Sequence, residues 1–167
     1  SPLDRGQHLA HHAKTVHQRP APAVGQRADR FGAALQPIMH AAPQTQEGGP
    51  GLEVLLRLKD DKGVSIAPAD FMRAAERYRL MPHVDRWVVQ TSLTALARGA
   101  VRLAPDRSLC INLSGQTLGD SAFLEFVVDC LDRTGVAPNR VCFEVTENSV
   151  ITNIEHARRF IGVLHGM

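Results

Sequence analysis

Apolar residues follow two different spacings along the chain from Phe31 onward. Four short apolar runs have the length of β-strands, and longer segments between them carry apolar residues every three or four positions, as helices with one buried face do. The predicted strands are Phe31–Met39, Leu52–Leu58, Ser108–Ser114 and Arg140–Thr146. The predicted helices are one that opens at Pro68 and ends at Pro82, followed by His83–Arg98, Asp120–Thr134 and Asn153–Leu164.

The order of these elements predicts the fold class. Strands and helices alternate from Leu52 onward, which is typical of parallel strands joined by right-handed crossovers. The segment Leu52–Leu58 is apolar on both faces apart from Glu53 and Arg57, as in a strand buried on both sides. The sequence therefore predicts an α/β fold with a mostly parallel sheet.

The apolar positions of each predicted helix mark the side that should face the sheet. The three cysteines also lie in apolar segments with no zinc or redox spacing, so they are expected to be core residues in a reducing compartment. The residues expected to face inward are Phe71, Ala74, Ala75 and Tyr78 in the first helix, Phe123, Val127, Cys130 and Leu131 in the third, Ile154, Ala157, Ile161 and Leu164 in the last, and Cys110 and Cys142 in the strands.

Charge is unevenly distributed. The formal net charge is +2, but residues 1–31 hold five basic and two acidic side chains, so the remainder is close to neutral. A near-neutral body argues against a nucleic-acid polymer as partner. No apolar run is long enough to span a bilayer, and no secretion signal is visible, which favours the cytoplasm. Residues 1–27 are predicted to be a linking arm; His8 and His12 have a helical metal spacing there, but no further ligand completes a site.

Three predicted strands each carry one polar side chain with an oxygen donor, and we expect these near the carboxyl ends. They are Glu53, Asn112 and Glu144. Parallel α/β folds place ligands at that end of the sheet, and two carboxylates with one amide oxygen suit Mg²⁺, Mn²⁺ or Ca²⁺. No histidine or cysteine falls at these strand ends, which argues against zinc. The alternatives are structural: a Glu53–Arg57 ion pair, a turn capped by Asn112, and a pairing of Glu144 with an arginine.

Five short segments, in this order and spacing, resemble the EAL-domain family of cyclic di-GMP phosphodiesterases. The matching segments are Gln36-Pro37-Ile38, Glu53-Val54-Leu55-Leu56-Arg57, Pro68 with Phe71 and Ala74-Ala75-Glu76, Asn112-Leu113-Ser114, and Glu144-Val145-Thr146-Glu147. The triplet that names the family is Glu-Val-Leu here, which keeps the acid and an apolar neighbour. The stretch from Ala74 to Trp87 is similar to EAL domains that follow a GGDEF domain.

The resemblance implies a modified (β/α)₈ barrel whose first strand is antiparallel to the others, and hydrolysis of cyclic di-GMP to linear pGpG with two Mg²⁺ or Mn²⁺ ions. By this resemblance Glu53, Asn112 and Glu144 would be metal ligands. Glu147 would anchor the loop that completes the metal site. Gln36, Leu55, Arg57 and Pro68 would contact the dinucleotide, and Arg57 suits a phosphate because its guanidinium donates two parallel hydrogen bonds.

Residues 28–167 are expected to form only the N-terminal half of such a barrel, about four of its eight strands. The family's later Asp-Asp-Phe-Gly-type motif and the ligands after it are not in this sequence. We therefore expect residues 1–167 to be inactive alone, and the open sheet edge to be covered by self-association or by a longer gene product. The alternative function is a degenerate EAL domain that acts as a cyclic di-GMP receptor or a protein-interaction module.

Overall fold

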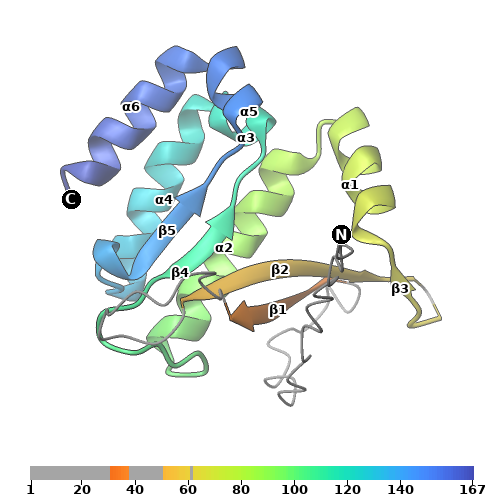
Figure 1. The fold of residues 1–167 in the computed structure, drawn as a ribbon, viewed down its shortest axis with the longest axis horizontal. Helices are drawn as coiled ribbons and strands as arrows, with labels where there is room; N and C mark the ends of the chain where they lie inside the picture. Colours follow the sequence, from red (N-terminus) through yellow and green to blue (C-terminus); the bar gives the residue numbers. More distant parts are fainter. Residues whose placement is uncertain (1–30, 38–50, 61) are drawn as a thin grey trace, which may run out of the picture.

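The computed structural model describes residues 31–37, 51–60 and 62–167, so the predicted arm at residues 1–27 lies outside the described part. The described elements form one curved sheet with helices along it (Figure 1). In chain order they are β1 (Phe31–Pro37), β2 (Leu52–Lys59), β3 (Ser65–Ile66), α1 (Pro68–Arg77), α2 (Met81–Ala97), β4 (Leu109–Asn112), α3 (Gly115–Leu118), α4 (Ser121–Thr134), the 3₁₀ turn η1 (Pro138–Arg140), β5 (Val141–Glu144), α5 (Glu147–Thr152) and α6 (Ile154–His165).

The sheet has the order β1-β2-β4-β5, and the short β3 pairs with the far end of β2. β1 is antiparallel to β2, whereas β2, β4 and β5 are parallel to one another. This confirms the predicted antiparallel first strand. The two parallel pairs are joined through helices, as the alternation of strands and helices predicted.

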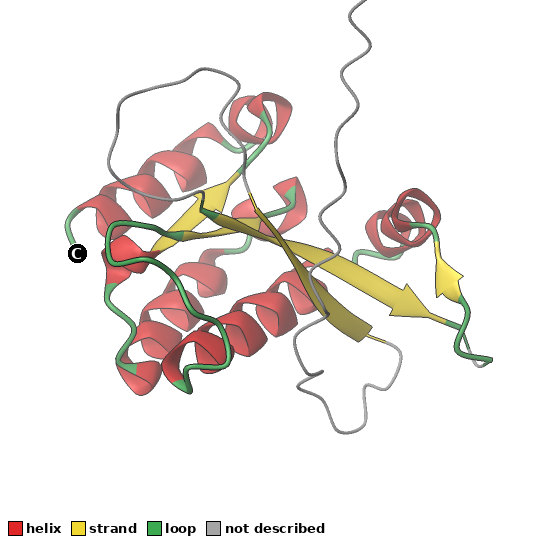
Figure 2. Cartoon of the chain, turned by 60° about the horizontal axis from the view of Figure 1, so that its bottom comes forward, coloured by secondary structure: helices red, strands yellow, loops and turns green. Residues whose placement is uncertain are grey.

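Alternate residues of the strands point to a core between the sheet and the helices. Val54, Leu109 and Ile111 are buried there, together with apolar residues of α2 and α4. Figure 1 shows α2, α4 and α6 in succession beside β4 and β5, and Figure 2 shows α1 at the far end of β2, beside β3. The inward positions predicted for α4 are confirmed, because Phe123, Val127, Cys130 and Leu131 are all buried.

The opposite face of the sheet is not covered by any helix of the described residues. It carries the other set of alternate residues, among them Leu55 and the exposed Arg57 of β2. The prediction that β2 is buried on both sides is therefore wrong for the described chain.

Several local predictions are corrected by the helices. Pro82 does not end the first helix but lies in the first turn of α2, where its missing N–H removes no helical hydrogen bond. Tyr78, predicted to face inward, caps α1 at its C-terminus and is 68% exposed, and Ala74 is exposed as well. In α6 Ala157 and Phe160 are buried, whereas Ile154 and Ile161 are exposed, because apolar residues occupy two sides of this helix.

Two short helices, α3 and α5, were not predicted. Each begins directly after the polar end of a strand and is capped by a hydroxyl, from Ser114 in α3 and Thr146 in α5. None of the helices in the described ranges is long and apolar enough to cross a membrane.

Candidate functional site

The uncovered face of the sheet brings Glu53 and Asn112 into direct contact. Asn112 is the last residue of β4, and its Nδ2 donates a hydrogen bond of 2.7 Å to Glu53 Oε1. The residues are 59 positions apart in sequence, so only the parallel pairing of β2 with β4 brings them together. No described residue donates to Asn112 Oδ1, which leaves the amide oxygen available as a ligand.

Glu144 completes a row of three oxygen-bearing side chains on this face: Glu53, Asn112 and Glu144. It is the last residue of β5 and the register partner of Asn112, and Leu113 N donates a backbone hydrogen bond of 2.9 Å to Glu144 O. Adjacent strands are about 4.8 Å apart, so register partners carry neighbouring side chains on the same face. The structure therefore brings all three predicted ligands together on one exposed surface.

The position of Glu53 within its strand differs from the prediction. Glu53 is the second residue of β2, not a residue near the carboxyl end. The strands are staggered: Glu53 is the register partner of Cys110, and β2 extends well beyond the end of β4. Strand stagger of this kind accompanies the tilt of strands in barrels. The site lies at the carboxyl ends of β4 and β5 but at the amino end of β2.

The structural alternatives for these side chains are not observed. Among the described residues no ion pair joins Glu53 to Arg57, and none joins Glu144 to an arginine. Arg57 Nη1 instead donates to the neighbouring carbonyl of Leu56. Asn112 bonds to a side chain on the next strand and caps no turn. Carboxylates that share a surface without a described cationic partner are suited to receive a cation.

Two cysteines lie in the row beneath. Cys110 and Cys142 are register partners on β4 and β5, two residues before Asn112 and Glu144. Their Sγ atoms and a Glu144 carboxylate oxygen are all within 4.8 Å of one another. Burial raises the pKa of the Cys110 thiol to about 12, and the charges of Cys142 and Glu144 act in the same direction.

This arrangement corrects one prediction about the cysteines. Cys110 and Cys130 are buried as expected, but Cys142 is exposed, because it lies on β5 at the end of the strand order whereas Cys110 lies on β4 between β2 and β5. No cysteine occupies the last position of β4 or β5, as predicted, but Cys110 and Cys142 lie two residues before those ends.

A buried polar network fixes the chain immediately after Asn112. Asp85 of α2 is only 3% exposed and accepts hydrogen bonds from Ser114 N at 2.9 Å and Thr117 Oγ1 at 2.6 Å. Burial raises the pKa of Asp85, and the two hydrogen bonds act against that rise. Sequence reasoning missed this residue. The available signal was an acid next to Val84 and two residues before Trp87-Val88-Val89, inside an otherwise apolar helix face.

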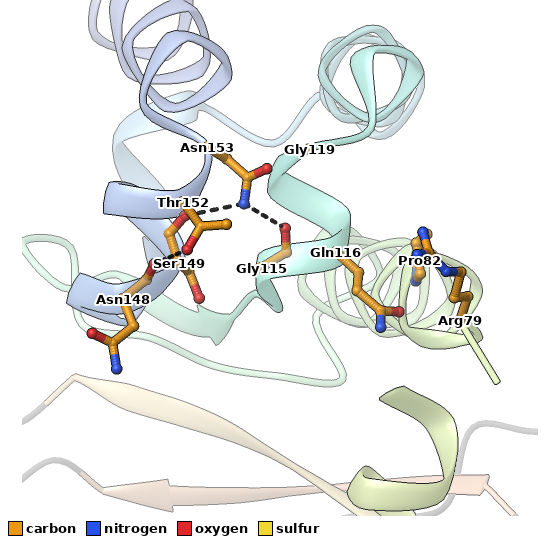
Figure 3. Close-up of a pocket in the computed structure, with 9 residues that line it drawn as sticks. All are labelled: Arg79, Pro82, Gly115, Gln116, Gly119, Asn148, Ser149, Thr152 and Asn153. Carbon is orange, nitrogen blue, oxygen red and sulfur yellow. Dashed lines mark hydrogen bonds between the residues drawn. The ribbon is translucent and has the colours of Figure 1, made fainter. Parts of the chain in front are cut away.

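The helices that follow β4 and β5 are packed closely together (Figure 3). Asn153 Nδ2 donates to Gly115 O and to Ser149 O, each at 3.2 Å. A Cβ on Gly115 would lie 2.9 Å from Ser149 Oγ, so only glycine permits this approach. A pocket of about 600 Å³ opens between α3, α5 and the start of α2, and none of the predicted site residues lines it.

The remaining predicted residues lie around the row. Gln36 is the register partner of Glu53 on β1 and is exposed, and Leu55 and Arg57 follow Glu53 on the same face of β2. Pro68 lies apart from them at the first position of α1 and is exposed. Glu147 begins α5, three residues after Glu144, and its side chain makes no hydrogen bond or ion pair with a described residue.

Known proteins are similar to this chain in sequence and in fold. The family model of the EAL domain matches residues 21–167. The chain is 37% identical over 102 residues to the cyclic di-GMP phosphodiesterase PdeB of Shewanella oneidensis, covering 61% of this chain and 12% of that protein. It is 29% identical over 106 residues to the cyclic di-GMP phosphodiesterase PdeF of Escherichia coli, covering 64% of this chain and 14% of that protein.

Solved structures of EAL domains have a similar fold. The FimX EAL domain from Pseudomonas aeruginosa, bound to c-di-GMP, matches with a TM-score of 0.70 and 26% identity over 83% of this chain and 55% of that chain. The match confirms an α/β fold of the EAL type, with a sheet that is not closed within the described residues. The antiparallel first strand and the three oxygen-bearing side chains on one face agree with the family model, and that model shows that this chain belongs to the EAL domain family.

Proposed function

We propose that this chain is part of a phosphodiesterase that hydrolyses cyclic di-GMP to linear pGpG with the help of divalent cations. The observation that carries the proposal is the Glu53–Asn112–Glu144 row, in which the two acids have no described cationic partner. Since the chain spans 12% of PdeB and 14% of PdeF, the activity belongs to a longer polypeptide that contains these residues.

The donor set fits a hard divalent ion. Two carboxylates and an amide oxygen lie on neighbouring strands, and the residues they come from are exposed or half-buried, so an ion has access from solvent. Mg²⁺ and Mn²⁺ prefer such oxygen ligands and commonly keep several waters, which an open surface allows. Glu53, Asn112 and Glu144 would hold the ion, which when bound supplies positive charge at the phosphoryl oxygens and lowers the pKa of a bound water.

The other residues bind and orient the substrate. The guanidinium of Arg57 would pair with a phosphoryl oxygen, because its present bond to a carbonyl on the strand surface is readily exchanged. Gln36 and Leu55 offer an amide and an apolar surface beside it, and Pro68 would border the ligand from the start of α1. Glu147 would anchor the loop that completes the metal site. Asn112 keeps Glu53 in one rotamer through the 2.7 Å hydrogen bond, so it positions that carboxylate as well as serving as a ligand.

Replacing Glu53 tests the proposal. In the longest natural polypeptide that contains these residues, Glu53→Gln should lower pGpG release with Mg²⁺ by more than about 100-fold, because loss of an outer-shell partner alone costs about 10–100-fold. The matched control is Glu125→Gln on the exposed side of α4, which should leave the rate unchanged. Unchanged turnover in the folded Glu53→Gln variant would refute the proposal.

A second candidate is a receptor that binds cyclic di-GMP without cleaving it. The observation in its favour is the FimX EAL domain, whose structure holds c-di-GMP. Calorimetry with cyclic di-GMP, combined with analysis of the recovered nucleotide, separates the two functions. Recovery of intact ligand after metal-dependent binding by the longer polypeptide supports the receptor. A cytoplasmic location, and self-association through the sheet edge at β5, stay predictions.

A further inference from the structure

A second set of ligands lies directly under the oxygen row. Cys110 and Cys142 occupy the same register position on neighbouring parallel strands, and Glu144 is two residues beyond Cys142 on the same face. Side chains at i and i+2 of a strand share a face, so the three groups converge without any change of backbone. Among the described residues, this is the only group of three histidine, cysteine, aspartate or glutamate side chains whose ligand atoms gather within 4.8 Å.

We propose that Cys110, Cys142 and Glu144 form a binding site for a thiophilic divalent ion of the Zn²⁺ class. Zinc binds cysteine sulfur at about 2.3 Å and carboxylate oxygen at about 2.0–2.2 Å, so the ligand atoms of a tetrahedral site are about 3.3–3.8 Å apart. The ligand atoms are now within 4.8 Å of one another, and they reach this spacing when rotation of the side chains brings them about 1 Å closer together.

The chemistry of the ligands separates this site from the oxygen row. Thiolates select soft or borderline ions such as Zn²⁺, whereas Mg²⁺ and Ca²⁺ select oxygen. Three protein ligands leave a fourth position for water, and Cys142 and Glu144 are exposed, so an ion can enter from the open face. Cys110 forms the inner wall of the site, since only 7% of its surface is exposed.

The two sites share Glu144, and this consequence rests on the proposed function. A carboxylate drawn toward the cysteines is withdrawn from the Glu53–Asn112 pair, so Zn²⁺ at the cysteine site weakens binding of Mg²⁺ at the oxygen row. The binding of Zn²⁺ itself does not depend on phosphodiesterase activity. A test by metal spectroscopy therefore fails separately from a test by turnover.

The experiment uses Co²⁺ as a spectroscopic substitute for Zn²⁺. Reduced residues 1–167 are titrated with Co²⁺ without oxygen, and thiolate-to-Co²⁺ charge transfer is measured in the near ultraviolet. This absorption requires sulfur ligands, so cobalt held by the histidines of residues 1–27 does not produce it. Added Zn²⁺ should bleach the band, and the competition gives the Zn²⁺ affinity.

Two matched cysteine variants decide the result. Cys142→Ser changes an exposed side chain, so the fold should persist, and it should abolish the band and lower Zn²⁺ affinity at this site by more than about 100-fold, since even outer-shell partners are worth about 10–100-fold. Cys130→Ser changes a free cysteine outside the cluster and should leave the band intact. Absence of the band in the wild-type chain, or a band of equal strength in Cys142→Ser, would overturn the proposal.

Zn²⁺ should also protect Cys142 from alkylation by iodoacetamide, which mass spectrometry of the Cys142 peptide measures. Glu144→Gln should retain the band with weaker Zn²⁺ binding. Unchanged Zn²⁺ affinity in that variant would overturn the assignment of Glu144 as a shared ligand.

Discussion

The buried carboxylate of Asp85 should determine how firmly the end of β4 is held. In Asp85→Ala, Ser114 N–H and the Thr117 hydroxyl lose their acceptor while Thr117 remains fully buried. A buried donor left without a partner costs about 1–3 kcal/mol, so the two together predict a loss of about 2–6 kcal/mol. This is a large fraction of the 5–15 kcal/mol by which domains are usually stable.

Urea unfolding at neutral pH, followed by circular dichroism, measures that loss. Asp85→Asn is the matched variant, because its amide oxygen can take the place of Oδ2, the one oxygen that accepts both hydrogen bonds, and its volume is nearly the same. We expect Asp85→Asn to be less destabilised than Asp85→Ala. If the midpoint of unfolding and its slope for Asp85→Ala were both equal to those of the wild type, the network would contribute nothing and the reasoning would be wrong.

The pH dependence supplies an independent check with a definite sign. Burial raises the pKa of Asp85 in the folded state, so the part of its contribution that comes from its extra protonation, as distinct from the hydrogen bonds it accepts, is complete below the unfolded pKa of about 3.9 and is lost as the pH rises through the folded pKa. The stability of the wild type relative to Asp85→Asn should therefore fall as the pH rises from about 4, and then level off. A relative stability that increases with pH would show that the folded pKa is lowered.

Three further predictions concern the surroundings of the site. Gly115→Ala should destabilise the chain by about 1–3 kcal/mol, as overpacking does, and Ser149→Ala in the same chain should restore much of the loss in a urea double-mutant cycle, because the added Cβ would lie 2.9 Å from Ser149 Oγ. Residues 1–167 alone should release no pGpG from cyclic di-GMP in a chromatographic assay, because the proposed function implies a two-metal site of which they would supply only part; turnover typical of enzymes would contradict this. In the longer polypeptide, Zn²⁺ should inhibit Mg²⁺-dependent turnover less in Cys142→Ser than in the wild type, and equal inhibition would separate the cysteines from the oxygen row.

The strands and their directions could be predicted because each segment carries its own signal. Leu52–Leu58 and Ser108–Ser114 are dense in apolar residues, and the helices between them have a clear period, which together require parallel strands. The conclusion that Glu53 and Asn112 share a site also followed from the sequence, since both occupy strands of one sheet. Their 2.7 Å contact agrees with it.

The stagger of the strands could not be predicted in this way. Register between parallel strands is set by the packing of crossover helices, not by a turn of fixed length, so no local pattern shows that Glu53 pairs with Cys110. The same limit hid the pairing of Cys110 with Cys142, because nothing in either segment specifies its partner. Asp85 was missed for a different reason: an acid in a helix is usually exposed, and only the loop after Asn112 gives it partners.

The stagger has a chemical consequence. Glu53 is the register partner of Cys110, and its carboxylate reaches along the sheet to Asn112, two residues further on β4. Glu144 lies beside both Asn112 and the two cysteines. The closeness of Glu144 to the cysteines comes from β5 itself, because Glu144 and Cys142 are two residues apart on one face, and it does not depend on the stagger of β2. Glu144 therefore belongs to two proposed ligand sets: the oxygen row, which suits a hard cation, and the cysteine site, which suits a softer one. Because one carboxylate cannot favour both sets at once, the ion bound at one of them should change the affinity of the other.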